Sequence, residues 1–241
     1  KPPSVPKKSF AERAADAKTG AEALQSAPVH NNKTLRAATT VEKDAYPGAR
    51  YKVESDTPLN GVPGDKVRDA VGDYAGNGYT NINWALRESA GDDDAIPGTH
   101  PTKPGTYSGK RAKDGITGID AVMKASPLEN DVVVYRGIAD PVKTFGSAWR
   151  SDGDNSGLRF VDNSYASTTA SKTVAGTFAG YGAGVKMNIL VPKGTRAIGI
   201  EQSRGSGLSH EQEMLLDRKL TYNIVRDYEE KGVRTVDVEV S

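Results

Sequence analysis

The stretch DVVVYRGI, residues 131–138, marks the point at which the chain changes character. A run of branched apolar residues of this length is typical of a buried β-strand, and we predict one from Val132 to Ile138. Arg136 interrupts the run, and a charged side chain there needs an anionic partner or a route to solvent. Its planar guanidinium suits a phosphate or a carboxylate, so Arg136 is either a ligand-binding residue or one half of an ordinary ion pair. Gly137 would let a ligand approach the backbone closely.

The segments on either side of this strand differ in periodicity. Upstream, the ranges 64–76, 78–90 and 115–126 space their apolar residues as helices do, with Asp65 as a plausible N-cap and Gly76 as a stop. Downstream, we predict short strands within 165–169, 185–192, 195–200, 212–218, 220–228 and 233–240. Helices followed by strands favour an α+β fold over alternating βαβ units.

Residues 1–45 form a segment of different composition from the rest of the chain. They are rich in Lys, Ala, Ser, Thr and Pro and poor in large apolar side chains, which predicts a flexible or weakly helical N-terminal arm. Residues 46–241 would form one catalytic domain. The arm is either a simple tether or a docking element for a delivery partner, and the start at Lys1 suggests a piece of a larger precursor.

Composition excludes several classes of function. A net charge of +1 gives no whole-molecule attraction to nucleic acid, so we do not expect nucleic acid as a partner. The absence of cysteine removes thiolate chemistry and zinc–thiolate sites. No segment is apolar enough to span a membrane. Residues 152–157, DGDNSG, begin like a calcium loop, but Asn163 stands where an EF-hand needs glutamate. We therefore predict no metal.

Two further stretches carry polar side chains at strand positions. In EQEMLLD, residues 211–217, Glu211 and Glu213 would project from the same face of a strand, where their charges repel unless something compensates. Ser167, Thr168 and Thr169 place three hydroxyl groups in a row. Each motif alone is also consistent with ordinary strand or turn residues.

Taken in order, these motifs resemble a known family. VVYRG as the arginine strand, YASTT as the Ser-Thr-Ser strand and EQEMLLD as the Glu-x-Glu strand are similar to the R-S-E class of mono-ADP-ribosyltransferases, closest to the toxin-like exoenzymes. DYAGNGYTNINWALR and VKMNILVPKGTRA match further elements of that pattern. The resemblance covers about residues 65–240. It implies N-terminal helices packed on a two-sheet core of mixed or antiparallel strands, with a cleft for NAD.

The resemblance also implies a role for each motif residue, with NAD as substrate and no metal. Glu213 would stabilise the ribose cation that forms as nicotinamide leaves. Ser167 would hydrogen-bond Glu213, and Thr168 would lie beside it in the NAD site. Arg136 would bind the NAD phosphates and Gly137 would offer its backbone to the nicotinamide amide.

The same resemblance implies which group accepts ADP-ribose and which aromatic residue stacks on the nicotinamide ring. Phe178 or Tyr181 would stack on nicotinamide, with simple packing as the alternative. Glutamate at position 211 goes with modification of arginine, which implies a target protein with a reactive arginine. The expected protein is a bacterial or phage toxin or effector, secreted or delivered into a target cell and active in the cytosol. The alternatives are an NAD glycohydrolase, transfer to a non-protein acceptor, and an inactive binding or assembly module.

Overall fold

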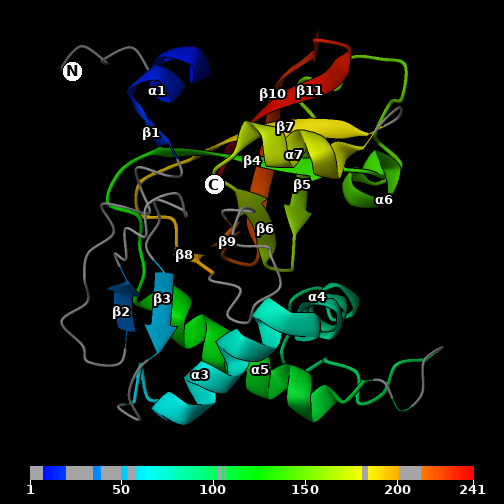
Figure 1. Cartoon of the computed structure of the whole chain (residues 1–241). Coiled ribbons are helices and arrows are strands. Elements are labelled where there is room, and N and C mark those ends of the chain that lie inside the picture. The colour runs from blue at the N-terminus through cyan, green and yellow to red at the C-terminus, as the bar shows by residue number, and fades with distance from the viewer. Residues whose placement is uncertain are drawn as a thin grey trace, which may run out of the picture.

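The computed structural model describes residues 8–19, 35–38, 50–53, 58–101, 105, 107–180, 184–200 and 213–241. Helices precede most of the strands, and the predicted α+β class is confirmed (Figure 1). The helical elements are α1 (Phe10–Asp16), α3 (Gly64–Asp73), the π-helical turn η1 (Tyr74–Gly78), α4 (Tyr79–Glu88), α5 (Gly109–Lys124), α6 (Pro141–Phe145) and α7 (Lys172–Ala179).

The strands of the described residues form two sheets. Their bounds are β1 (Lys18–Thr19), β2 (Leu35–Ala38), β3 (Arg50–Val53), β4 (Val132–Ile138), β5 (Arg159–Asp162), β6 (Ala166–Thr169), β7 (Val185–Val191), β8 (Ala197–Gly199), β9 (Glu213–Leu216), β10 (Leu220–Glu230) and β11 (Val233–Val240). The large sheet has the order β5-β10-β11-β7-β4-β6-β9-β8, with β1 added in parallel to β4, while β2 pairs with β3. The strand predicted from Val132 to Ile138 is therefore confirmed as β4.

The large sheet changes direction between β4 and β6. Tyr135 and Thr169 are the one residue pair in the β4–β6 ladder, whereas β4 and β7 pair along their whole length. Figure 1 shows β6 and β9 running across the direction of β7. The sheet thus behaves as two packed halves, a larger one from β5 to β4 and a smaller one of β6, β9 and β8.

Two hydrophobic cores hold these layers together. One lies between the two halves of the sheet, where Val134 and Met187 pack in the same cluster as Met214 and Leu216. The other joins the smaller half to α3, α4 and α5 through residues such as Leu215. Because side chains alternate along a strand, β9 contributes to both cores, and its position is fixed from both sides.

The first helical segment differs from its predicted boundaries. Pro63 occupies the N-cap of α3 without a side-chain hydrogen bond, and Asp65 lies one residue inside the helix, where its carboxylate faces the positive end of the helix dipole. Gly76 does not end the helix. The chain passes through η1, in which Gly76 adopts φ −89° and ψ −122°, and continues directly into α4. The buried Tyr74 lies in this π-helical turn, and its ring packs edge-on against that of Tyr165 with 5.8 Å between the ring centres.

Candidate active site

Three neighbouring parts of the fold position the predicted motif residues. Arg136 lies on β4, Ser167 on β6 and Glu213 at the first position of β9. Since Thr169 pairs with Glu213 and Ser167 with Leu215, the two hydroxyl residues and Glu213 project from the same face of the smaller half-sheet. β6 therefore lies next to both of the other strands that carry the motif.

Ser167 and Glu213 are in direct contact. The Ser167 hydroxyl donates a hydrogen bond of 2.6 Å to Oε1 of Glu213. Hydrogen bonds to a carboxylate are short and strong, so this contact restricts the rotamer of Glu213. The strand register supports the contact, because Ser167 is two residues from Thr169, which lies directly opposite Glu213.

Arg136 has an anionic partner that sequence analysis did not identify. Its Nη1 lies 3.5 Å from Oδ2 of Asp162 at the end of β5, and its side chain is 20% exposed. Asp162 also accepts hydrogen bonds from the backbone N–H and the hydroxyl of Ser164, at 3.0 Å and 2.6 Å. Arg87 of α4 approaches the other oxygen of Asp162 at 3.8 Å. Asp162 thus lies between two guanidinium groups from different layers of the protein.

The buried Tyr74 shows that these charges share one region. Its hydroxyl accepts a 2.9 Å hydrogen bond from Nδ2 of Asn83. Burial is the main cause that raises the pKa of the Tyr74 phenol; Glu213 and Asp162 raise the pKa further, while the Asn83 hydrogen bond and Arg136 oppose the shift. The phenol is therefore neutral at physiological pH, and charges from β4, β5 and β9 all act on it.

The bend of the sheet is what allows Arg136 and Glu213 to approach the same residue. In a flat sheet they would lie on opposite faces, because Tyr135 pairs with Thr169 and Thr169 pairs with Glu213. The β4–β6 ladder is a single pair, so the regular alternation of faces does not carry across it. Both charges act on the pKa of the Tyr74 phenol, so Arg136 and Glu213 lie within electrostatic range of the same residue.

Gly137 is required by the packing of α7 on β4. A Cβ atom at this position would lie 2.1 Å from the carbonyl oxygen of Ala175 and 2.3 Å from the backbone nitrogen of Ala179. The close approach that the sequence suggested is therefore made by a helix of the protein itself. The same helix presents Phe178, whose side chain is 53% exposed and so is free to contact a ligand.

Thr168 faces away from Ser167. It is buried, and its hydroxyl donates a 2.6 Å hydrogen bond to the carbonyl oxygen of Met214 on β9. This hydroxyl already links two strands, so it is engaged within the sheet and is not presented to a ligand beside Ser167.

The remaining predicted site residues, Glu211 and Tyr181, lie outside the described residues, as does the segment 201–212 that precedes β9. Within the described part of the chain, no group of three or more His, Asp or Glu side chains could hold a metal ion, and no helix is long and apolar enough to cross a membrane.

The segment that resembled a calcium loop has a structural role. Asn155 donates through Nδ2 to Asp227 at 2.8 Å and accepts from the backbone N–H of Arg150 at 2.8 Å. Oδ1 of Asp154 accepts from the backbone N–H of Ser156. These contacts tie the loop to β10.

Sequence analysis missed Tyr74, Asn83 and Asp162. Tyr74 and Asn83 lie nine residues apart, on η1 and α4, and their contact depends on the π-helical turn, which no periodicity rule predicts. The sequence offered only a weak indication of Asp162, which is an acid at the end of β5, five residues before Ser167. The need of Arg136 for an anion was apparent from the sequence, but its partner was not.

The architecture is shared with solved structures of bacterial ADP-ribosyltransferases. C3stau2 from S. aureus, solved with NAD, is 19% identical with a TM-score of 0.57 over 73% of this chain and 87% of that chain. The Clostridium limosum C3 exoenzyme is 19% identical with a TM-score of 0.56 over 73% and 85%. The BECa toxin of C. perfringens, solved with NADH, is 18% identical with a TM-score of 0.55 over 73% of this chain but 43% of its own. At these identities the similarity establishes the fold.

The family follows from the sequence itself. Residues 44–240 match the family model described as ADP-ribosyltransferase exoenzyme. This chain therefore belongs to the ADP-ribosyltransferase exoenzyme family. The predicted resemblance to toxin-like mono-ADP-ribosyltransferases is confirmed, and NAD is the substrate that fits this class. No curated protein gives a significant match.

Proposed function

We propose that this protein transfers ADP-ribose from NAD to an arginine side chain of a target protein. The observation that carries the proposal is the hydrogen bond between Ser167 and Glu213, which fixes the Glu213 carboxylate. The charges of Glu213 and Arg136 both act on the pKa of the Tyr74 phenol. A fixed carboxylate beside a cationic anchor suits a substrate that carries phosphates at one end and forms a sugar cation at the other.

The reaction begins with cleavage of the nicotinamide–ribose bond. The bonding electron pair leaves with nicotinamide, and positive charge develops on the ribose as an oxocarbenium-like cation. Glu213 stabilises that cation, and Ser167 keeps the carboxylate in place so that little reorganisation is needed. Arg136 binds the phosphates, while Phe178 or Tyr181 provides a flat apolar surface for the nicotinamide ring.

Glu211 determines the acceptor in this proposal. A carboxylate can pair with an incoming guanidinium, orient one of its nitrogens toward the ribose cation and accept the proton that is lost as the new C–N bond forms. Glu211 and Glu213 therefore have separate tasks, and the cationic groups of the two bound substrates offset the repulsion between them.

The test compares three glutamate variants with labelled NAD, using agmatine and a cell lysate as acceptors. Glu213→Gln should lower both ADP-ribose transfer and NAD hydrolysis by about a thousandfold, since a neutral amide cannot stabilise the cation. Glu211→Gln should abolish transfer to agmatine and keep measurable hydrolysis. The matched control is Glu129→Gln, which changes an exposed glutamate and should behave like the wild type.

Each arm of this comparison can contradict the proposal. Full activity in Glu213→Gln would remove Glu213 from the mechanism. Unchanged transfer to agmatine in Glu211→Gln would show that the acceptor is selected elsewhere. Labelled lysate protein that resists hydrolysis of arginine–ribose bonds would exclude arginine as the acceptor residue.

A second candidate function is NAD hydrolysis with water as the main acceptor. The segment EQSRGSGLSH, residues 201–210, contains no Phe, Tyr or Trp, and Leu208 is its one large apolar side chain. A recognition segment with so little apolar surface gives a protein target few anchoring contacts. This function predicts release of free ADP-ribose at the same rate with and without lysate or agmatine.

The cellular setting is part of the proposal. Exoenzyme family membership supports a toxin or effector that is secreted or delivered into a target cell, and NAD and target proteins are both available in the cytosol. The N-terminal arm is the proposed connection to a delivery partner or to a larger precursor.

A further inference from the structure

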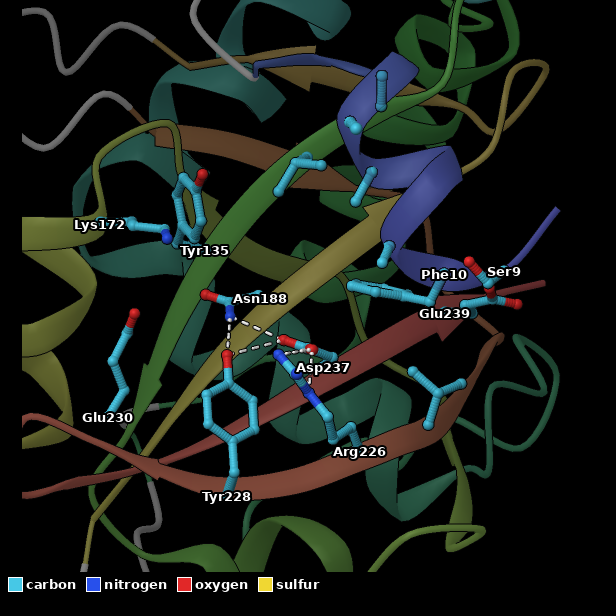
Figure 2. Close-up of a pocket in the computed structure, with 16 residues that line it drawn as sticks. Ser9, Phe10, Tyr135, Lys172, Asn188, Arg226, Tyr228, Glu230, Asp237 and Glu239 are labelled. Carbon is cyan, nitrogen blue, oxygen red and sulfur yellow. Dashed lines mark hydrogen bonds and ion pairs between the residues drawn. The ribbon is translucent and has the colours of Figure 1, made fainter.

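Different polar networks occupy the two sides of the large sheet. One forms the floor of a cavity of about 730 Å³ between α1 and the strands β4, β7, β10 and β11 (Figure 2). Val133 and Tyr135 line this cavity, so it lies on the face of β4 opposite Arg136. The floor side chains bond to one another at 2.8–3.2 Å, and they are Asn188, Arg226, Tyr228 and Asp237. Another network joins the smaller half-sheet to the helical layer of α3, α4 and α5, next to the strands that carry Ser167 and Glu213.

Asp120 of α5 is the acceptor at the centre of this other network. The Tyr165 hydroxyl donates to Oδ1 of Asp120 at 2.5 Å. Arg218 donates to the same oxygen through Nε at 3.1 Å and to Oδ2 through Nη2 at 2.5 Å. Both donors lie at one end of the β6–β9 ladder, because Tyr165 directly precedes β6 and Arg218 follows β9 after one intervening residue. A single carboxylate of α5 therefore holds both strands.

Arg218 extends the network to a second part of the helical layer. Its Nη1 and Nη2 donate to the two oxygens of Asp93 at 2.5 Å and 2.8 Å, and Nη1 also donates to the carbonyl oxygen of Gly91 at 3.3 Å. Both residues lie in the connection between α4 and α5. Burial lowers the pKa of Arg218, but its hydrogen bonds to Asp93 and Asp120 outweigh burial and hold the pKa above its ordinary value. The guanidinium is thus matched to two carboxylates at once.

Tyr165 connects this network to the catalytic pair. Its side chain is 1% exposed and packs in the same core as Leu215, the residue that pairs with Ser167. Tyr165 also lies two residues before Ser167 in the chain, and its ring meets the ring of Tyr74 edge-on. Tyr74 in turn lies within electrostatic range of Glu213. A displacement of Tyr165 would therefore be transmitted to the start of β6 and to the helical side of the site.

The network is better suited to fixing one arrangement of these elements than to adding stability. The side chain of Arg218 is 11% exposed and that of Asp120 is 35% exposed, so both charges give up part of their hydration. This loss offsets much of the Coulomb attraction, and a buried ion pair therefore adds little net stability over apolar side chains of the same volume. A planar guanidinium that bonds to two carboxylates nevertheless holds its partners at fixed distances and angles.

We propose that Asp120 and Arg218 are positioning residues for the ADP-ribosyl transfer described above, on whose assignment this inference rests. Together they hold the end of the β6–β9 ladder against α5 and the α4–α5 connection. This keeps β6 and β9 aligned, so that the Ser167 hydroxyl meets the Glu213 carboxylate in the orientation that the reaction needs. Asp120 and Arg218 are assigned no contact with NAD and act through the two strands.

The test combines the kinetics of nicotinamide release with amide hydrogen exchange in two variants and their double variant. Asp120→Asn keeps the shape of the side chain and removes its charge, while Tyr165→Phe removes one hydroxyl from the network. We expect kcat to fall about tenfold in Asp120→Asn and about threefold in Tyr165→Phe, with the KM for NAD within about twofold of the wild type. Because Tyr165 acts through Asp120, the double variant should be no slower than Asp120→Asn alone. Amides of β6 and β9 should exchange faster in Asp120→Asn.

The matched control is Asp114→Asn, which makes the same substitution on the exposed face of the same helix. Asp114 pairs with Lys110 at 2.6 Å, and its side chain is 61% exposed. The control therefore removes an ion pair from α5 without touching β6 or β9. It should leave kcat, KM and the exchange of β6 and β9 amides as they are in the wild type.

The outcomes separate this proposal from the proposed function. A lower melting temperature with unchanged kcat would make the network purely structural and overturn the proposal, as would a change confined to KM. Additive losses in the double variant would contradict a shared route through Asp120. If Asp120→Asn fails to fold, Tyr165→Phe decides alone. A wild type without NAD turnover would count against the proposed function; faster exchange in β6 and β9 would then still support the positioning network, and unchanged exchange would overturn it.

Discussion

The pairing of Ser167 with Glu213 is the residue-scale feature on which the proposed chemistry depends. A carboxylate on a strand end can adopt several rotamers, and a 2.6 Å hydrogen bond selects one of them. The cost of ordering that side chain is met during folding and is not required again when NAD binds. This is the physical advantage of a preorganised site over a mobile one.

Ser167→Ala should therefore reduce the rate of NAD cleavage more than the affinity for NAD. We expect kcat to fall about 10- to 100-fold with a much smaller change in KM, because the lost contact orients the catalytic carboxylate and does not bind the substrate directly. Steady-state kinetics of nicotinamide release would measure both constants. Ser156→Ala, at an exposed loop position, is the control. A change confined to KM would assign Ser167 to substrate binding.

Asp162 is a second residue-scale determinant, because it balances the charges of Arg136 and Arg87. Asp162→Asn keeps the shape of the side chain and removes its charge, so the guanidinium of Arg136 loses its anchor. We expect the KM for NAD to rise several-fold while the Ser167–Glu213 contact remains. An unchanged KM would show that Arg136 is positioned by other contacts.

At the scale of elements, the packing of α7 on β4 links the arginine strand to the helix that carries Phe178. The contact leaves no space for a side chain at position 137, since a Cβ would meet the backbone of Ala175 and Ala179. Backbone atoms cannot move aside as a flexible side chain can, so helix and strand would have to separate.

Gly137→Ala should therefore destabilise the protein by about 3 kcal/mol and lower activity through displacement of α7. The control is Gly176→Ala in the same helix, where a Cβ would meet nothing within 4 Å. Removing that helical glycine should stabilise the protein by about 0.5–1 kcal/mol. Urea denaturation of both variants measures the free energies of unfolding. Equal effects of the two substitutions would contradict the packing argument.

At the scale of the whole molecule, a buried acid joins the loop after α6 to the edge of the larger half-sheet. The Asp227 side chain is 4% exposed and accepts hydrogen bonds from Arg234 at 3.0 Å and 2.7 Å and from Asn155 at 3.0 Å and 2.8 Å. Burial alone would raise the pKa of Asp227, but the hydrogen bonds from Arg234 and Asn155 outweigh it and lower the pKa below its ordinary value. Folding is thus coupled to ionisation of this carboxyl.

The sign of the resulting pH dependence follows from that lowered pKa. The stabilisation is fully present above the unfolded-state pKa of about 3.9 and is lost as the pH falls through the folded-state value. The free energy of unfolding of Asp227→Asn should be about 2 kcal/mol lower than that of the wild type at pH 7. This difference, the stability gap, should stay constant down to about pH 5. The gap should narrow only below about pH 4. Thermal unfolding of both proteins across this pH range measures it; a gap that closes between pH 7 and 5 would contradict the assignment.

The N-terminal arm is the other feature of the whole molecule. Deleting residues 1–45 removes α1, the short strand β1 that pairs with the start of β4, and β2, which pairs with β3. The deletion should leave NAD turnover within about threefold of the full chain, because α1 lies on the face of β4 opposite Arg136. It should also lower the melting temperature. Loss of turnover in a folded deletion variant would make the arm part of the catalytic domain.

The sequence alone determined the class of fold, the motif strands and the family. Runs of apolar residues and their periodicity reflect local burial, and for that reason β4 was predicted with its observed limits. The sequence also predicted that Arg136 needs an anionic partner, because a single charged side chain lies within an apolar strand.

The tertiary structure alone decided which residues meet. Asp162 beside Arg136, Tyr74 beside Asn83, α7 against Gly137 and the cavity under α1 all depend on where the sheet bends and where the helix passes through a π-helical turn. Contacts of this kind join segments that are distant in the chain, and local propensity carries no information about such distances. They arise from the packing of two half-sheets and a helical layer around shared cores.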